Sequence, residues 1–139
     1  MNSVEFQEGG FSPEECRALC SDLENCGFDY VELSGGTYQE LGFSHKREST
    51  KAREAFFLDF AKMIIPGLSR TKVYVTGGLR STRAMIYALK TVDGVGLARP
   101  VCHDFDLGRK LLDGSTEGAR KILLDEQDFV TTAVAAGSQ

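Results

Sequence analysis

The middle of the chain reads Lys72-Val73-Tyr74-Val75-Thr76-Gly77-Gly78, a short run of strand-forming residues that ends in two glycines. A compact apolar run bounded by turn residues is typical of a buried strand. Two comparable runs flank it, at 29–33 and at 93–97, and turn-forming or small residues follow each of them. We therefore expect three short strands at the centre of the fold.

Helical patterns separate these three strands. Ser12-Pro13-Glu14-Glu15 combines a capping box with proline at the first helical position, and Gly27 offers a left-handed stop, so a helix is expected from residue 13 to about 25. Further helices are expected over 51–65 and 81–90, with short helical segments over 106–112 and 116–124. The side chains expected to face the core are Phe57, Phe60, Ala61 and Ile64 of the second helix, and Met85, Ile86 and Leu89 of the third.

The remaining segments carry weaker signals. Residues 35–50 are polar and glycine-containing, which predicts a long loop after the first strand, and loops of that length are often functional. Residues 3–6 are expected to be the end of one more strand. Residues 131–139 show no clear periodicity and are expected to form a tail.

Strands that alternate with helices imply right-handed crossovers and a parallel sheet, so the fold class is α/β. A chain of 139 residues is one domain by length. A complete (β/α)8 barrel takes about 250 residues, and so it does not fit in this chain alone.

Composition excludes several functions. Lys and Arg number 16 against 20 Asp and Glu, a net charge of −4, so a broad nucleic-acid surface is not expected. The first residues form no signal peptide and no stretch is long and apolar enough to span a membrane, so we expect a soluble, cytoplasmic protein. The cysteines form no Cys-x-x-Cys pair, which favours reduced thiols used as small apolar residues over a zinc site or a disulfide.

The candidate binding residues follow the second and third strands. In parallel α/β folds ligands bind at the carboxyl ends of the strands. Gly77 and Gly78 allow backbone amides to approach a ligand, and Ala98-Arg99 adds a forked cation suited to phosphate. A phosphate-bearing ligand is thus favoured, although paired glycines are also common in simple tight turns.

The other polar residues of this region are expected to be structural or solvent-exposed. Arg80 and Arg83 belong to the following helix and are expected to be solvated. Glu32 lies within a strand and is either inward-facing or structural, and the structural interpretation is preferred. His45 and His103 are expected on loops, exposed, and therefore poor acid–base candidates. The chain has no Gly-x-Gly-x-x-Gly, no phosphate loop of the GxxxxGK type and no serine nucleophile elbow, which disfavours a nicotinamide-binding Rossmann domain.

Several motifs, taken together, resemble the carboxyl-terminal part of the NADH:flavin oxidoreductases, the old yellow enzymes, and especially their fungal members. The resemblance covers residues 2 to about 124. It is carried, in the family's order and spacing, by Asn2-Ser3-Val4-Glu5-Phe6-Gln7, Gly27-Phe28-Asp29-Tyr30-Val31-Glu32-Leu33-Ser34-Gly35-Gly36-Thr37-Tyr38, Arg53-Glu54-Ala55-Phe56-Phe57, Val75-Thr76-Gly77-Gly78 and Asp93-Gly94-Val95-Gly96-Leu97-Ala98-Arg99-Pro100.

This resemblance implies a particular fold and cofactor. The family is a (β/α)8 barrel that holds FMN, is reduced by NADH or NADPH, and reduces activated alkenes such as α,β-unsaturated carbonyls. Residues 1–124 would then be the end of strand five through strand eight, about three to four βα units of an incomplete barrel, and 125–139 a tail. Gly77 and Gly78 would match the seventh-strand glycine loop and Arg99 the eighth-strand arginine that hold the FMN phosphate. Ala98 stands where many members have glycine.

The resemblance also implies that part of the family's site lies outside the matched segment. The flavin-ring contacts, the residues that grip the substrate carbonyl, the tyrosine proton donor and the basic residue beside flavin N1 all precede it, so no catalytic residue and no metal ligand is assigned here. Three hypotheses follow. The chain is a flavin enzyme that needs a complementary half-barrel, or it is a non-catalytic module in a homo-oligomer, or it is a truncated product that does not fold.

Overall fold

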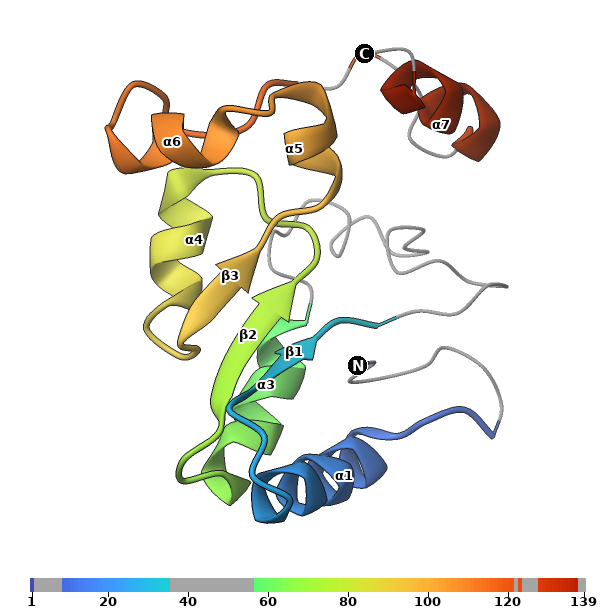
Figure 1. Ribbon diagram of the computed structural model, residues 1–139, viewed down its shortest axis with the longest axis vertical. Coiled ribbons are helices and arrows are strands. Elements are labelled where there is room, and N and C mark those ends of the chain that lie inside the picture. The colour runs from blue at the N-terminus through green and yellow to red at the C-terminus, as the bar shows by residue number, and fades with distance from the viewer. Residues whose placement is uncertain (2–8, 36–56, 122, 124–127, 138–139) are drawn as a thin grey trace.

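Three parallel strands form the centre of the molecule. The computed structural model describes residues 1, 9–35, 57–121, 123 and 128–137. Strands β1 (Tyr30–Leu33), β2 (Lys72–Thr76) and β3 (Gly94–Gly96) lie in the order β1-β2-β3, and both pairings are parallel. All three point toward the end of the molecule where α5 lies (Figure 1). The expectation of an α/β chain with a parallel sheet is confirmed.

Helices connect and follow the strands, and most of them stand where the sequence predicts them. The helix expected from residue 13 is confirmed, with Ser12 accepting from the Glu15 amide and Glu15 accepting from the Ser12 amide. Of the helix expected over 51–65, residues 51–56 lie outside the described part, and so do the expected strand at 3–6 and most of the loop at 35–50. The helices of the described residues are α1 (Pro13–Asn25), α3 (Leu58–Ile64), the 3-10 turn η1 (Ile65–Gly67), α4 (Thr82–Ala88), α5 (Arg99–His103), α6 (Leu107–Leu112) and α7 (Phe129–Gly137).

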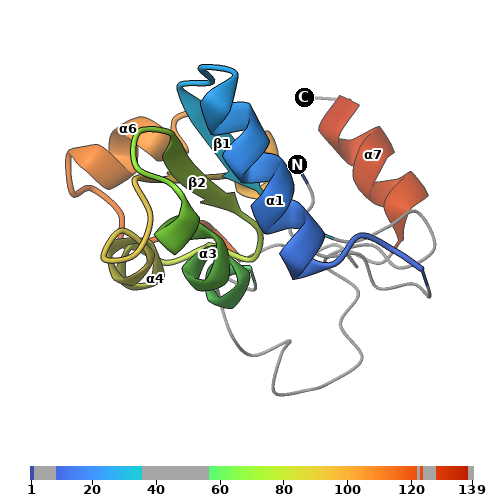
Figure 2. The same ribbon diagram turned by 90° about the horizontal axis from the view of Figure 1, so that it is seen from below.

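One face of the sheet is packed and the other is open. Along β1 and β2 buried and exposed residues alternate. The side chains that face the core are Val31, Leu33, Val73 and Val75, and those exposed on the other face include Tyr30 and Tyr74. The buried side chains pack with residues of α1, α3 and α4, and these helices lie on the same side of the sheet (Figures 1 and 2). The described residues thus form a two-layer wall with helices on one side.

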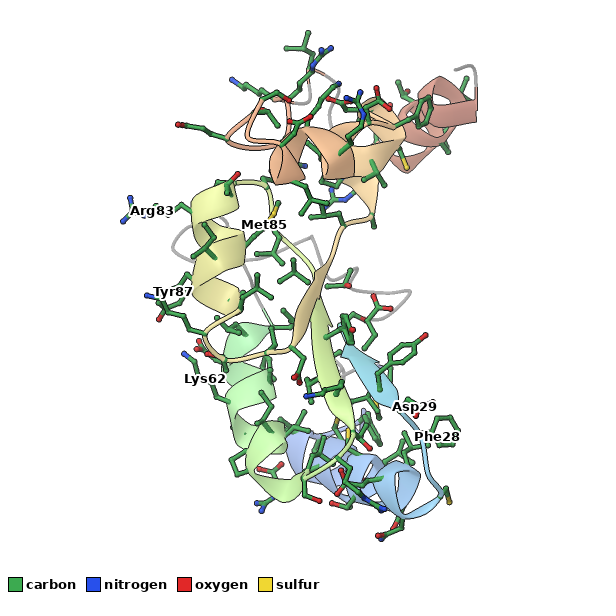
Figure 3. The ribbon with its side chains drawn as sticks, turned by 60° about the vertical axis from the view of Figure 1, so that its left-hand side comes forward. Phe28, Asp29, Lys62, Arg83, Met85 and Tyr87 are labelled. Carbon is green, nitrogen blue, oxygen red and sulfur yellow. The ribbon has the colours of Figure 1, made fainter. Side chains whose placement is uncertain are left out.

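The core-facing stripe of α4 differs from the one expected. Met85 is buried as predicted, but Ile86 is 57% exposed and Leu89 is 48% exposed. Ala88 takes the inner position instead, because residues three apart share a helix face, and Leu89 is the C-cap at the end of the helix. Figure 3 shows Met85 directed toward the sheet, whereas Arg83 and Tyr87 project away from it.

The carboxyl-terminal third departs most from expectation. Residues 116–121 do not form the expected helix. Instead Gly118 pairs with Ser81 in an antiparallel bridge, and the Thr82 and Ala119 amides donate to the Glu117 and Arg80 carbonyls at 2.8 and 2.7 Å. A Cβ on Gly118 would lie 2.7 Å from the Arg80 carbonyl oxygen, so this pairing requires a glycine there.

Two helices were not expected. The sequence predicted a loop after Ala98, but α5 begins at Arg99, and Pro100 sits in its first turn where a missing N–H is tolerated. The expected tail contains α7, an alanine-rich helix, and Asp128 just before it accepts from the Thr131 amide through Oδ1 at 3.0 Å. Neither α7 nor any other helix in the described part of the chain is long and apolar enough to cross a membrane.

The amino ends of the strands are fixed by carboxylates. Glu24 at the end of α1 accepts from the backbone amides of Ser69, Arg70 and Thr71, at 2.8 to 3.0 Å. Asp93 accepts from the Val73 amide at 3.0 Å and pairs with Lys72 at 2.9 Å, which sets the entry into β3. Both carboxylates hold the connections at the end of the sheet opposite to the predicted binding residues.

The cysteines divide by location. Cys16 and Cys20 are fully buried in the core, as expected for thiols used as small apolar residues. A hydrogen bond with Cys20, together with burial, raises the pKa of Cys16. Cys26 and Cys102 are exposed, and all four are free thiols.

Candidate functional site

The loop after β2 is built from two glycines that no other residue replaces easily. Gly77 has φ of +133° and Gly78 of +69°, both in the region that disfavours side chains. A Cβ on Gly77 would lie 2.6 Å from a ring carbon of Phe57, which is 3% exposed. The loop is therefore packed directly against a core aromatic ring, and the sequence feature singled out as a binding loop is structurally constrained.

The neighbouring strand brings the second predicted pair to the same edge. Thr76 pairs with Gly96, so Gly77-Gly78 and Ala98-Arg99 follow adjacent positions of adjacent strands. Ala98 is exposed and caps α5 without a side-chain hydrogen bond, and Arg99 is half-buried. The structure thus brings the residues Gly77, Gly78, Ala98 and Arg99 to neighbouring strand ends.

A polar pair on the open face of the sheet was missed by sequence reasoning. Thr76 donates its hydroxyl to Glu32 Oε1 across β1 and β2, and Glu32 is exposed. Gly96 makes room for the pair, since a Cβ there would lie 1.8 Å from Thr76 Oγ1 and 3.2 Å from Glu32 Oε1. Glu32 was expected to be structural, and only the register of the strands shows that it stands beside the candidate loop.

A second layer of side chains on the open face, formed by Tyr30 and Tyr74, is aromatic. The rings of Tyr30 and Tyr74 meet edge to face at 5.5 Å between centroids. Tyr74 also lies over Gly94, where a Cβ would fall 2.1 Å from the ring. The glycines of β3 therefore accept side chains of β2, and the open face changes from aromatic to polar toward the carboxyl ends of the strands.

The other predicted residues lie elsewhere. Arg83 is exposed on the outer face of α4 as expected. Arg80 was expected to be a solvated residue of that helix, but it precedes α4 and is half-buried in the segment paired with 117–119. His103 was expected on an exposed loop, but it ends α5 and is half-buried. His45 lies outside the described residues.

Two carboxylates with lowered pKa values have structural partners. The amides of Thr71 and Arg70 hold the pKa of Glu24 at about 2, at the amino end of the sheet. Lys110 lowers the pKa of Asp104, whose side chain is 9% exposed and pairs with Lys110 at 2.5 Å. Neither carboxylate stands beside Gly77-Gly78, so these perturbed groups tie helices and loops together.

The fold and the candidate site together define a class of protein. It is an α/β chain with a parallel sheet, helices on one side, and two glycines, an alanine and an arginine just beyond the carboxyl ends of two adjacent strands. Backbone amides and guanidinium groups bind anions, phosphate above all.

Three curated fungal proteins share sequence with most of this chain. Over 98% of its length the chain is 45% identical to the NADH-dependent flavin oxidoreductase nadA of Aspergillus parasiticus, and it covers 31% of that protein. It is 40% identical over 103 residues to the NADH-dependent flavin oxidoreductase iccE of Talaromyces variabilis, covering 66% of this chain and 25% of that protein. A third, iliE of Neonectria sp., is 35% identical over 111 residues, covering 72% of this chain and 14% of that protein.

The chain is therefore a homologue of the fungal NADH-dependent flavin oxidoreductases, and the resemblance carried by its motifs is confirmed. It spans about a third of the length of the Aspergillus relative and less of the other two. No protein-family model matches the chain.

Proposed function

We propose that this chain forms the flavin-phosphate portion of an NADH-dependent flavin oxidoreductase of the old yellow enzyme type. The observation that supports it is the placement of Gly77-Gly78 and Ala98-Arg99 at adjacent ends of parallel strands. Backbone amides in a positive-φ turn and a forked guanidinium together match the oxygens of a phosphate group. The relatives are named for flavin and NADH, which makes a flavin phosphate the fitting ligand.

The proposed cofactor is FMN. Gly77 and Gly78 would offer backbone N–H groups, Arg99 its guanidinium, and Ala98, in a position that often carries glycine in this family, keeps its own backbone N–H. When bound, a flavin would supply hydride transfer, from NADH or NADPH to an activated alkene such as an α,β-unsaturated carbonyl, with the balancing proton coming from the complementary half-barrel. This chain's residues would bind and orient the phosphate end of the cofactor.

The proposed fold of the whole is a (β/α)8 barrel, of which residues 1–124 supply the end of strand five through strand eight. The wall-like architecture, with helices on one face only, supports this proposal. The edge of β1 also supports it, because in this proposal the end of strand five lies beside β1. At that edge the Met1 amine donates to the Glu32 carbonyl at 2.6 Å and the Ser34 amide donates to the Met1 carbonyl at 3.0 Å. In this proposal residues 125–139, which include α7, form a segment outside the barrel.

Catalysis would need a complementary half-barrel. The groups that contact the flavin ring, hold the substrate carbonyl and donate a proton are assigned to that half, and no catalytic or metal-binding role is given to this chain. The proposed partners are thus the complementary half-barrel and a small-molecule substrate, without nucleic acid or membrane, in the cytoplasm.

Flavin binding tests the proposal. The purified chain is titrated with FMN and with riboflavin, and binding is followed by quenching of flavin fluorescence. We expect FMN to bind more tightly, and Arg99→Met to weaken FMN by roughly ten- to a hundredfold with little effect on riboflavin. Arg83→Met, which removes an exposed charge on the far side of α4, is the matched control. Equal affinity for the two flavins, or no binding, contradicts the phosphate site.

Activity is tested separately. NADH or NADPH consumption on an enone is measured for the chain with and without the complementary segment of a relative. Turnover that appears only in the mixture supports the half-barrel proposal, and failure of the mixture to turn over despite flavin binding contradicts it.

An alternative function is a non-catalytic module in a homo-oligomer. The observation that favours it is the open sheet face with the exposed Tyr30 ring. A colourless, soluble oligomer would support this alternative. A preparation that lacks a cooperative unfolding transition would instead indicate a product that does not fold.

A further inference from the structure

The Glu32–Thr76 pair faces the space beside the candidate phosphate loop. Both side chains lie on the face of the sheet that no described helix covers, and Thr76 directly precedes Gly77. Any ligand whose phosphate is held by Gly77-Gly78 and Arg99 must pass close to this pair if the rest of it extends over the open face. The pair is therefore placed to meet the part of the ligand next to its phosphate.

The chemistry of the pair favours hydroxyl groups and disfavours phosphate. A carboxylate has about four acceptor sites, and Thr76 uses one of them. An exposed negative charge repels a phosphate dianion but accepts hydrogen bonds readily from neutral hydroxyls, as acidic residues do from the ribose of dinucleotides. The Thr76 hydroxyl, whose hydrogen is directed at Glu32, still offers its lone pairs as an acceptor.

Gly96 provides the space in which Glu32 and Thr76 pair. Gly96 lacks the Cβ that would lie 1.8 Å from Thr76 Oγ1, so the sequence of β3 leaves room for this hydroxyl over the strand. Gly94 does the same for Tyr74 one layer below. The polar layer thus has a fixed position between the aromatic layer and the strand ends.

We propose that Glu32 and Thr76 form a polyol subsite that accepts hydrogen bonds from the ribityl hydroxyls of the flavin, next to its phosphate. The inference rests on the proposed flavin binding and extends it to residues that carry no phosphate contact. Glu32 would bind the hydroxyls directly, and Thr76 would hold the carboxylate in place and accept a further hydrogen bond.

The test pairs variants with a ligand that lacks the hydroxyls. Fluorescence titrations compare FMN with an isoalloxazine that carries a phosphopentyl chain, which keeps the ring and the phosphate. The wild-type chain should prefer FMN by roughly tenfold or more. Glu32→Gln and Thr76→Val should each remove most of that preference by weakening FMN alone, and Gly96→Ala should act in the same direction.

Controls separate this inference from the proposal beneath it. Tyr30→Phe, on the same face but one layer away, should leave the preference unchanged, and circular dichroism verifies the fold of each variant. If the wild-type chain binds both flavins and Glu32→Gln weakens both equally or neither, the polyol subsite is wrong while the phosphate site stands. If the wild-type chain binds neither flavin, both proposals are wrong.

Discussion

Glu24 shows how one carboxylate can fix the start of a strand. It closes α1 and accepts three consecutive amides just before β2, and it is 9% exposed. Three N–H groups directed at one carboxylate favour its charged form, which is why its pKa falls from 4.5 to about 2. The residue joins the end of α1 to the start of β2 through hydrogen bonds.

We predict that the stability of the chain depends on Glu24 in acid. Because the folded-state pKa is the lower one, the stabilisation is complete above about pH 4.5 and is lost as pH falls toward 2. Glu24→Gln should lower the urea midpoint at pH 7 and flatten its fall between pH 4.5 and 2. Glu14→Gln, on the exposed first turn of the same helix, serves as the control. Parallel pH profiles for wild type and Glu24→Gln would contradict this role.

Two glycine-to-alanine substitutions should have opposite signs. Gly77→Ala combines φ of +133° with a contact of 2.6 Å to Phe57, and should destabilise the fold by at least about 1 kcal/mol. Gly108 lies within α6 with open space around its Cβ position, so Gly108→Ala should stabilise by about 0.5–1 kcal/mol. Chemical denaturation measures both. A neutral Gly77→Ala would show that the loop after β2 is not conformationally constrained.

At the scale of elements, the capping box of α1 lends itself to a direct test. Ser12→Ala removes the acceptor for the Glu15 amide and should cost about 1 kcal/mol in the free energy of unfolding. Ser21→Ala in the same helix removes only a bond to the Arg17 carbonyl, which is already within the helix, and should be neutral or slightly stabilising. Thermal unfolding followed by circular dichroism compares the two variants. Equal effects would show that the Ser12 cap does not stabilise this helix.

The sequence predicted correctly those elements whose bounds depend on residues close together in the chain. The bounds of β2 and the start of α1 follow from strand formers between turn residues and from Ser12, Pro13 and Glu15. Local signals did not predict the segment at 116–121, because its pairing with Ser81 depends on a partner some 35 residues away and on a close approach at Gly118.

The candidate site was predictable only in part for the same reason. Gly77, Gly78, Ala98 and Arg99 could be found because each follows a recognisable strand, and the register places them together. Glu32 and Thr76 could not, since their pairing depends on the alignment of β1 with β2 and on the missing Cβ of Gly96. An exposed Glu within a strand has no local signal that distinguishes a ligand contact from an ordinary surface residue.

At the scale of the whole molecule, the open face of the sheet is the surface through which we expect the chain to associate. The packed face buries apolar residues from both strands and helices, but the opposite face exposes an aromatic pair and leaves the outer edges of β1 and β3 unpaired by any described strand. Apolar surface and open edges of this kind favour association. Whether a complementary half-barrel or a second copy covers it, contact through this face should depend on Tyr30.

Self-association of the purified chain should therefore be weakened by a charge at Tyr30, which is 60% exposed in the aromatic layer. Tyr30→Lys buries a new cation in any interface formed there and should raise the dissociation constant by roughly tenfold or more, as measured by sedimentation equilibrium. Tyr87→Lys makes the same change of charge at a tyrosine that is 56% exposed on the outer face of α4, and should leave the constant unchanged. If both variants shift it equally, net charge and not the sheet face controls assembly. If the wild-type chain is monomeric throughout, a second copy does not cover this face.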